Sequence, residues 1–211
     1  MKTISNSARE TILRKLDSMH NQHFSNVHYE SVRSNAEYFV QPDAHSLITT
    51  FCSVFTNISG SCVVCDSEKE ALQYIASILN SCTAYSIEPK ISQMCKTEGI
   101  AVASDELFAE TAKFAITSCD ALVARTASVL VNSQTLNGRK SIAAPETHIV
   151  LAYETQMYAD LPDAFAHISY ETIPSQITVI TGPSRTADIE KTLVLGAHGP
   201  KNLVVVIIKN V

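Results

Sequence analysis

The residues best suited by type and spacing to bind a ligand lie near the C-terminus, in the segment Ile180-Thr-Gly-Pro-Ser-Arg-Thr-Ala-Asp-Ile-Glu190. An apolar run ends at about Ile180, and Gly182 with Pro183 makes a sharp exit from it. Ser184 is then placed to cap a following helix, because its side-chain oxygen can accept from a free backbone N–H of the first turn. We expect backbone N–H groups and a positive helix end at the carboxyl edge of a sheet, where open α/β sheets bind ligands.

Such a turn is suited to a small anionic ligand, since the free N–H groups of a helix start favour carboxylate and phosphate. Ser184, Arg185 and Thr186 would add donors, and Gly182, which shapes the turn, is the fourth candidate ligand-binding residue of this segment. Three residues are candidates for a catalytic acid or base, namely Asp188, Glu190 and His198. The same residues also fit a structural role, in which Ser184 caps the helix, the acids complement its dipole and the glycines shape turns.

The elements that must position this segment are apolar runs alternating with amphipathic helical patterns. Strands are expected at residues 61–65, 83–87, 100–103, 121–124, 128–131, 149–152, 177–180 and 203–208. Helices are expected at 47–55, 71–79, after Pro89, and at 107–115, 163–168 and 185–195. Continuous apolar strands separated by helices predict a largely parallel sheet covered on both faces. The short gap between 124 and 128 allows an antiparallel pair, so the sheet is expected to be mixed.

The chain of 211 residues has the length of one sizeable domain. Its first 42 residues are expected to form an N-terminal helix and an arm. Ser7 and Glu10 make a capping-box pattern, and Ile12, Leu13 and Leu16 recur at helical spacing after it. We therefore expect a single α/β domain over residues 1–211.

Charge and hydropathy exclude several classes of partner. The formal net charge of -5 is mild, and the densest basic spot is the pair Arg139-Lys140, so attraction to nucleic acid or anionic lipid is not expected. The longest aliphatic run, Leu203 to Ile208, is far shorter than the ~20 residues that span a bilayer. The N-terminus lacks the pattern of a signal peptide. We expect a cytoplasmic protein without membrane insertion.

The cysteines predict neither a metal site nor a redox centre. Cys62-Val-Val-Cys65 matches a CxxC spacing, but it lies in an expected strand, where positions three apart point to opposite faces. The other cysteines do not form the closely spaced quartet of an iron–sulfur site. A reducing cytoplasm also argues against disulfides. We expect the cysteines to be buried small hydrophobes and the chain to carry no cofactor.

Three segments resemble the LUD family of lactate-utilisation proteins (LutC/YkgG type). The long ordered pattern Thr181-Gly-Pro-Ser-Arg-Thr-Ala-Asp-Ile-Glu190, followed by Gly196-Ala-His-Gly-Pro200, is similar to the family's C-terminal signature. Gly138-Arg139 with Ser141, Pro145 and His148-Ile149-Val150 looks like the family's segment before a strand. Ala121-Leu-Val-Ala-Arg-Thr-Ala-Ser128 looks like its strand-turn-strand piece. The resemblance extends from about residue 100 onward.

One of these segments departs from the family pattern. Arg125-Thr126-Ala127-Ser128 stands where family members commonly have Glu-Thr-Gly-Thr or Glu-Thr-Gly-Ser. A carboxylate that could act as base or nucleophile is thus replaced by a cation, and a flexible glycine by alanine. Arg125 could bind an anionic ligand, together with Thr126, Ser128 and Arg139, or could pair with Asp120 or another acid.

The resemblance implies a three-layer αβα fold of the NagB/RpiA/CoA-transferase kind with a mostly parallel, mixed sheet. It also implies a part in a three-component system that oxidises L-lactate to pyruvate, in which iron–sulfur protein subunits are the partners that carry the redox centres. Two other functions stay open. One is a stand-alone enzyme acting on an acyl, CoA or sugar-phosphate substrate, and the other is a non-catalytic interaction or regulatory module.

Overall fold

A computed structural model describes residues 9–15, 47–134, 140–168, 174–186, 194–196 and 199–209. The chain divides into two compact units, residues 1–40 and 41–211. In the first unit the structure describes one helix, residues 9–15, on which Ile12 and Leu13 are exposed. This confirms a helix at the start of the chain. The assignment of residues 1–42 as an arm of a single domain stays a prediction.

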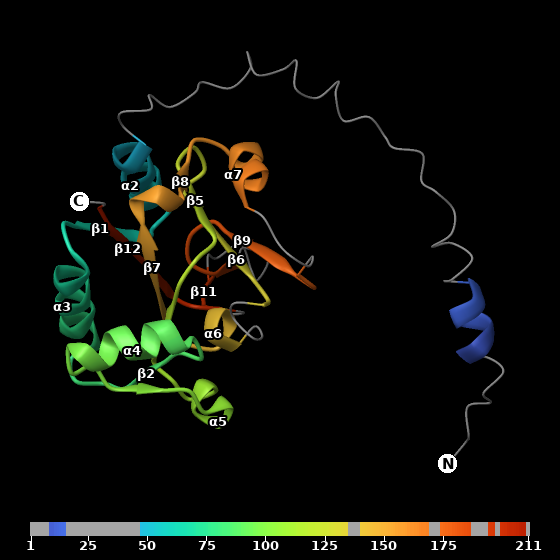
Figure 1. Ribbon diagram of the computed structural model, residues 1–211, viewed down its shortest axis with the longest axis horizontal. Coiled ribbons are helices and arrows are strands. Elements are labelled where there is room, and N and C mark those ends of the chain that lie inside the picture. The colour runs from blue at the N-terminus through green and yellow to red at the C-terminus, as the bar shows by residue number, and fades with distance from the viewer. Residues whose placement is uncertain are drawn as a thin grey trace. The chain divides into compact units, whose positions relative to one another are not determined.

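The second unit is built on a six-stranded sheet in which every neighbouring pair is parallel (Figure 1). Its strands, in spatial order, are β1 (Ser61–Cys65), β12 (Asn202–Ile208), β7 (Thr147–Tyr153), β4 (Phe114–Thr117), β2 (Ala84–Tyr85) and β3 (Val102–Ala103). The central strands are continuous apolar runs because a parallel sheet is buried on both faces. Leu203 to Ile208 is buried throughout.

The two faces of this sheet belong to two different cores. Val204 and Val206 of β12 pack with the helices α3 (Glu68–Leu79) and α4 (Pro89–Thr97). Val205 and Ile207 face the other way and pack with α2 (Leu47–Asn57). Strand residues alternate between faces with a period of two, so one apolar run supplies both cores. Ser67 caps α3 by accepting from the Glu70 N–H, as its sequence pattern predicts.

A second sheet of four strands covers the face that α2 also covers. Its order is β8 (Met157–Tyr158), β5 (Ala121–Val123), β6 (Ser128–Asn132) and β9 (Ile177–Ile180). The pairs β5–β6 and β6–β9 are antiparallel, and β5–β8 is parallel. The far face of this sheet packs against α7 (Leu161–His167). The antiparallel pair expected at 121–131 is confirmed, but it belongs to this separate sheet and not to the parallel one.

Three short elements lie between strands: α5 (Glu106–Ala109), α6 (Lys140–Ala143) and the 3-10 turn η3 (Glu154–Gln156). The helix predicted over 107–115 was therefore too long, because the chain enters β4 at Phe114. Strand β4 was not predicted. Its four buried residues pair with β7 on one side and β2 on the other.

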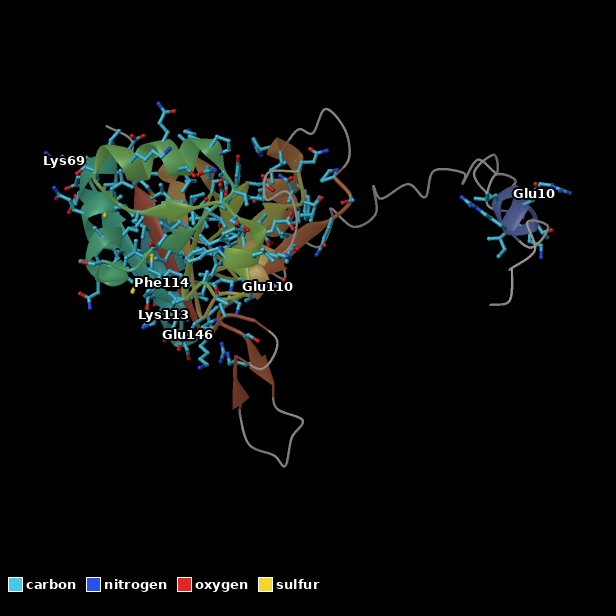
Figure 2. All side chains as sticks on the ribbon, turned by 90° about the horizontal axis from the view of Figure 1, so that it is seen from below. Glu10, Lys69, Glu110, Lys113, Phe114 and Glu146 are labelled. Atoms are coloured by element: carbon cyan, nitrogen blue, oxygen red, sulfur yellow. A yellow bond between two sulfur atoms is a disulfide. The ribbon has the colours of Figure 1, made fainter. Side chains whose placement is uncertain are left out.

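The helix predicted over 185–195 was wrong at its described residues. Arg185–Thr186 forms β10 and Val194–Leu195 forms β11, and the two pair antiparallel. The two strands project away from the two sheets (Figure 2). Residues 187–193 lie outside the described part of the chain. A local capping pattern at Ser184 is therefore outweighed by the pairing of Arg185 with Leu195 and of Thr186 with Val194.

The cysteine predictions are confirmed in one respect and wrong in another. Cys62 packs into the core shared with α2, and Cys65 into the core shared with α3, so the CxxC pair does point to opposite faces. However, Cys52 of α2 and Cys62 of β1 form a disulfide, with Cα atoms 5.4 Å apart. The other four cysteines are free thiols. Within the described ranges, no helix has the length and apolar character needed to cross a membrane.

Candidate functional site

The turn after β9 is built by a glycine and two backbone hydrogen bonds. Gly182 has φ 83°, a left-handed conformation that favours glycine, and a Cβ there would lie 3.1 Å from the Ile58 carbonyl oxygen. The Ser184 N–H donates to the Pro200 carbonyl (2.9 Å), and the Gly196 N–H donates to the Ser184 carbonyl (2.9 Å). Gly182 thus lets the backbone of the turn lie close to Ile58, and the sharp exit predicted at Gly182-Pro183 is present.

These contacts place the turn at the amino edge of the parallel sheet. Pro200 lies just before Lys201 and the start of β12, and the N–H groups of Lys201 and Asn202 both donate to the carbonyl of Glu146, which directly precedes β7. Figure 2 labels Glu146 and Phe114 at this edge, near the base of the β10–β11 hairpin. The prediction that this turn lies at the carboxyl edge of the parallel sheet is therefore wrong. The turn does follow the carboxyl end of β9, but β9 belongs to the second sheet.

The donors predicted for an anion at this turn are engaged with the chain. The Ser184 N–H is bonded to Pro200, and the Arg185 guanidinium donates to the Ile58 carbonyl. The side chain of Thr186 is not described, and Arg139, Asp188, Glu190 and His198 lie outside the described residues. The roles proposed for these residues stay predictions.

A cavity of about 360 Å³ lies beside the turn, between the two sheets. The parallel sheet contributes His148 of β7 and Leu203 of β12, and the second sheet contributes residues of β9. The remaining described lining comes from α6, Gln176, the turn after β9 and the segment before β12, namely Ile142, Ala143, Gln176, Gly182, Pro183, Ser184, Gly199 and Pro200. Of the sequence-predicted site residues that the structure describes, Gly182 and Ser184 line this cavity.

His148 is the one ionisable side chain in the described lining, and it is 1 % exposed. Its Nε2 lies 2.8 Å from Thr117 Oγ1 on the neighbouring strand β4. Its Nδ1 is buried and has no hydrogen-bond partner among the described residues. Burial lowers the pKa of His148 from 6.5 to about 4, because desolvation disfavours the charged imidazolium. The imidazole is therefore neutral at pH 7.

Gln176 is a second lining residue with a buried polar atom that lacks a hydrogen-bond partner among the described residues. Its Nε2 donates to Thr178 Oγ1 (2.9 Å), and its Oε1 is buried without a partner in the described part of the chain. A buried polar atom that lacks a hydrogen bond costs on the order of 1–3 kcal/mol. Sequence reasoning missed both residues as site candidates. His148 lies in one of the three segments that resemble the family, and nothing in the sequence singles out Gln176.

Three hydroxyl groups link the β5–β6 turn to the end of β9. Thr126 Oγ1 lies 2.8 Å from Ser128 Oγ, which lies 2.8 Å from Thr181 Oγ1. Ser128 is 2 % exposed and has a partner on each side. The structure therefore does bring the two predicted residues Thr126 and Ser128 together. Their hydroxyls satisfy one another and tie the two strands.

Arg125 forms an ion pair with Asp160, with Nη2 2.7 Å from Oδ1. The pairing acid was not Asp120, the nearest acid in sequence. Burial alone would raise the pKa of Asp160, but hydrogen bonds from Arg125 and the Leu161 N–H, with the charge of Arg125, lower the pKa below its usual value. Asp160 also begins α7 by capping Leu161 (2.7 Å). Arg125 thus holds the β5–β6 turn to the start of α7.

The carboxyl edge of the parallel sheet holds one buried acid that the sequence analysis did not single out. Glu88 follows β2, is 7 % exposed, and accepts from the Ser118 N–H (2.8 Å) and Ser118 Oγ (2.5 Å). Burial raises the pKa of Glu88, partly offset by these two hydrogen bonds. Glu88 directly follows the apolar strand expected at residues 83–87, and this position was the sequence signal that could have marked it as a site candidate.

Neither edge offers a metal cluster in the described chain, where no group of three or more His, Cys, Asp or Glu side chains is arranged to hold an ion. What the described site can do chemically is bind. It combines an apolar cavity, a neutral imidazole and an amide.

Curated relatives match the chain over part of its length. It is 34% identical over 106 residues to a protein of Geobacillus sp. (strain WCH70) named lactate utilization protein C, covering 48% of this chain and 44% of that protein. It is 36% identical over 96 residues to the protein of the same name from Shouchella clausii, covering 44% and 42%. The matched segments thus span less than half the length of these relatives.

A solved structure shares the fold. A DUF162 family protein from Deinococcus radiodurans superposes with a TM-score of 0.60 at 18% identity, covering 79% of this chain and 99% of that one. At this identity the likeness concerns the fold alone. The LUD domain model matches residues 48–208, which include both sheets from β1 to β12. The chain belongs to the LUD domain family.

Proposed function

We propose that this chain is a non-iron–sulfur component of a lactate-utilisation system that oxidises L-lactate to pyruvate in the cytoplasm. The observation that carries the proposal is the LUD match over residues 48–208, together with relatives named lactate utilization protein C. Electron transfer is assigned to iron–sulfur protein subunits, which are the proposed partners. The chain itself is assigned binding and positioning roles.

The finer fold assignment is part of the same proposal. We assign the chain to the NagB/RpiA/CoA-transferase kind of three-layer architecture. In support, the parallel sheet has α3 and α4 on one face and α2 on the other. The four-stranded sheet shares the second face with α2, which is the local departure from a layer made of helices alone.

The contacts of Arg125 support a binding role for the chain rather than chemistry at the β5–β6 turn. The family's usual glutamate at this position would be an acid, whereas Arg125 is an ion-pair partner of Asp160. Thr126 and Ser128 are joined to each other and Ser128 to Thr181. These interactions hold the turn beside β9 and the start of α7. We therefore propose that the ligand-contacting residues of the signature are Gly182 and Ser184, which line the cavity.

Purification from the native host tests this proposal. The tagged chain, isolated from cells grown on L-lactate, is expected to bring down an iron–sulfur protein, detected by mass spectrometry and by iron and sulfide analysis of the complex. Two controls accompany it. One is the tagged chain isolated from cells grown on glucose, and the other is an unrelated protein with the same tag isolated from lactate-grown cells. Recovery of the chain from lactate-grown cells without any iron–sulfur protein would contradict the proposal.

A further inference from the structure

The cavity between the two sheets has a distinctive chemical lining. Most of its described walls are apolar, from Ile142, Val179, Ile180, Pro183 and Leu203. No Lys, Arg, Asp or Glu is among the described lining residues. The volume of about 360 Å³ lies at the lower end of the range of small-molecule sites, roughly 300–1,000 Å³.

The described lining residues offer a charged occupant no side chain of opposite charge. A charge moved from water into a site without a partner of opposite sign costs several kcal/mol. Of the cations that directly adjoin the described lining in sequence, Arg185 donates to the Ile58 carbonyl and Lys201 pairs with Glu146. The Ser184 N–H is used by Pro200. His148 cannot supply the charge at neutral pH, because burial keeps its pKa at about 4.

Two side chains of the lining carry a buried polar atom whose hydrogen-bonding capacity is unused within the described residues. Gln176 Oε1 is an acceptor, and it requires a donor. His148 Nδ1 donates or accepts according to the tautomer that Thr117 selects at Nε2. His148 comes from the parallel sheet, whereas Gln176 directly precedes β9 of the second sheet. Both residues line the cavity, so a ligand held there lies beside both side chains.

We propose that this cavity binds an uncharged small molecule with a compact apolar body and a group that both donates and accepts hydrogen bonds, as a carboxamide or a lactam does. The apolar body packs between α6 and β9. The polar group pairs with Gln176 and His148. This inference concerns the cavity whose lining residues Gly182 and Ser184 the proposed function assigns to ligand contact, and it assigns no step of lactate oxidation.

A set of matched probes tests the ligand class on the full-length chain. The uncharged probes are benzamide, 2-pyridone and δ-valerolactam, and the charged isosteres are benzoate and benzylamine, with L-lactate and pyruvate added as small anions. Binding is followed by NMR titration of backbone amides. At least one uncharged probe is expected to move signals of residues 176–184 and 199–203, and the charged probes are expected to leave them unchanged.

Two variants locate the binding. Ala143 is exposed and lines the cavity, so Ala143→Phe should fill it and abolish binding of the uncharged probe. Its neighbour Ala144 is also exposed and does not line the cavity, and Ala144→Phe should change the affinity by less than about twofold. Gln176→Leu should weaken binding by roughly 3- to 10-fold, the value of one hydrogen bond. Thermal unfolding verifies that each variant is folded.

One result of these experiments supports the inference, and two results overturn it. Binding of an uncharged probe that Ala143→Phe abolishes and Ala144→Phe preserves supports the inference. Tighter binding of benzoate, lactate or pyruvate than of every uncharged probe overturns it. Failure of all three uncharged probes to bind also overturns it. None of these results bears on whether the chain co-purifies with an iron–sulfur protein, so the two proposals fail separately.

Discussion

At the scale of single residues, His148 combines a structural and a binding role. Its ring is buried on the face of β7 that also carries Val150 and Ala152, and it is bonded at Nε2 to Thr117. Burial lowers the pKa of the ring to about 4, so the folded chain holds this histidine neutral. Unfolding exposes it and restores a pKa near 6.5.

The pH dependence of stability follows from this difference. Between pH 6.5 and 4 the unfolded chain binds a proton that the folded chain does not, so stability contributed by His148 is present above pH 6.5 and is lost as the pH falls. The loss approaches about 3 kcal/mol near pH 4. Urea unfolding at several pH values measures it.

His148→Phe should remove most of the loss of stability between pH 6.5 and 4, since it deletes the titrating ring while keeping a buried aromatic side chain. His167→Gln, a change at an exposed histidine of α7, is the matched control and should keep the wild-type slope. The raised pKa of Glu88 acts in the opposite direction. Because the folded chain binds this proton more tightly than the unfolded chain, Glu88 adds stability as the pH falls. Equal slopes for wild type and His148→Phe would show that His148 titrates normally.

Arg125 and Ala127 show how much a single turn could be predicted. The sequence allowed Arg125 either an anionic ligand or an acidic partner, and the structure gives it Asp160, 35 positions away. Ala127 has φ 48°, the left-handed conformation that the family's glycine would adopt more easily, and it is fully buried. The turn shape was therefore predictable from the family's glycine. The partner of Arg125 was not, because it depends on where α7 packs.

At the scale of elements, several apolar runs were predicted at the right place and one strand was missed. Strands 61–65 and 177–180 are confirmed at those bounds, and the helix at 47–55 lies within α2. The four-residue strand β4 was missed, because a short apolar run fits a helix or a strand equally and its pairing with β7 decides. The helix predicted after Ser184 was wrong for a similar reason. The backbone of Ser184 is hydrogen-bonded to Pro200 and Gly196 rather than along a helix.

The disulfide between α2 and β1 gives a test at this scale. Purified without reductant and then denatured, the chain should show four reactive thiols, and six after reduction. Because the disulfide closes a short loop, with a sequence separation of 10, its reduction should lower the free energy of unfolding by about 2–3 kcal/mol.

Cys52→Ser should reproduce the effect of reduction, since it removes one half of the disulfide. Cys82→Ser, at an exposed free cysteine, should leave stability within about 0.5 kcal/mol of wild type. Six reactive thiols in the unreduced protein would contradict the pairing of Cys52 with Cys62.

At the scale of the whole molecule, the sequence predicted the class of fold and the family better than the place of the site. Alternating apolar runs and helices correctly predicted an α/β protein with a parallel sheet. They did not reveal that β5, β6, β8 and β9 form a second sheet, and this is why the signature turn lies at the amino edge of the first one. Sheet membership depends on long-range pairing, which local patterns do not encode.

Growth on L-lactate is the sharpest test of the proposal that the chain serves lactate oxidation. A strain of the native host lacking this chain should grow slowly or not at all with L-lactate as the carbon source, and normally with pyruvate. A plasmid copy of the wild-type chain should restore growth on L-lactate. Equal growth rates of the deletion strain and the parent strain on L-lactate would contradict the account.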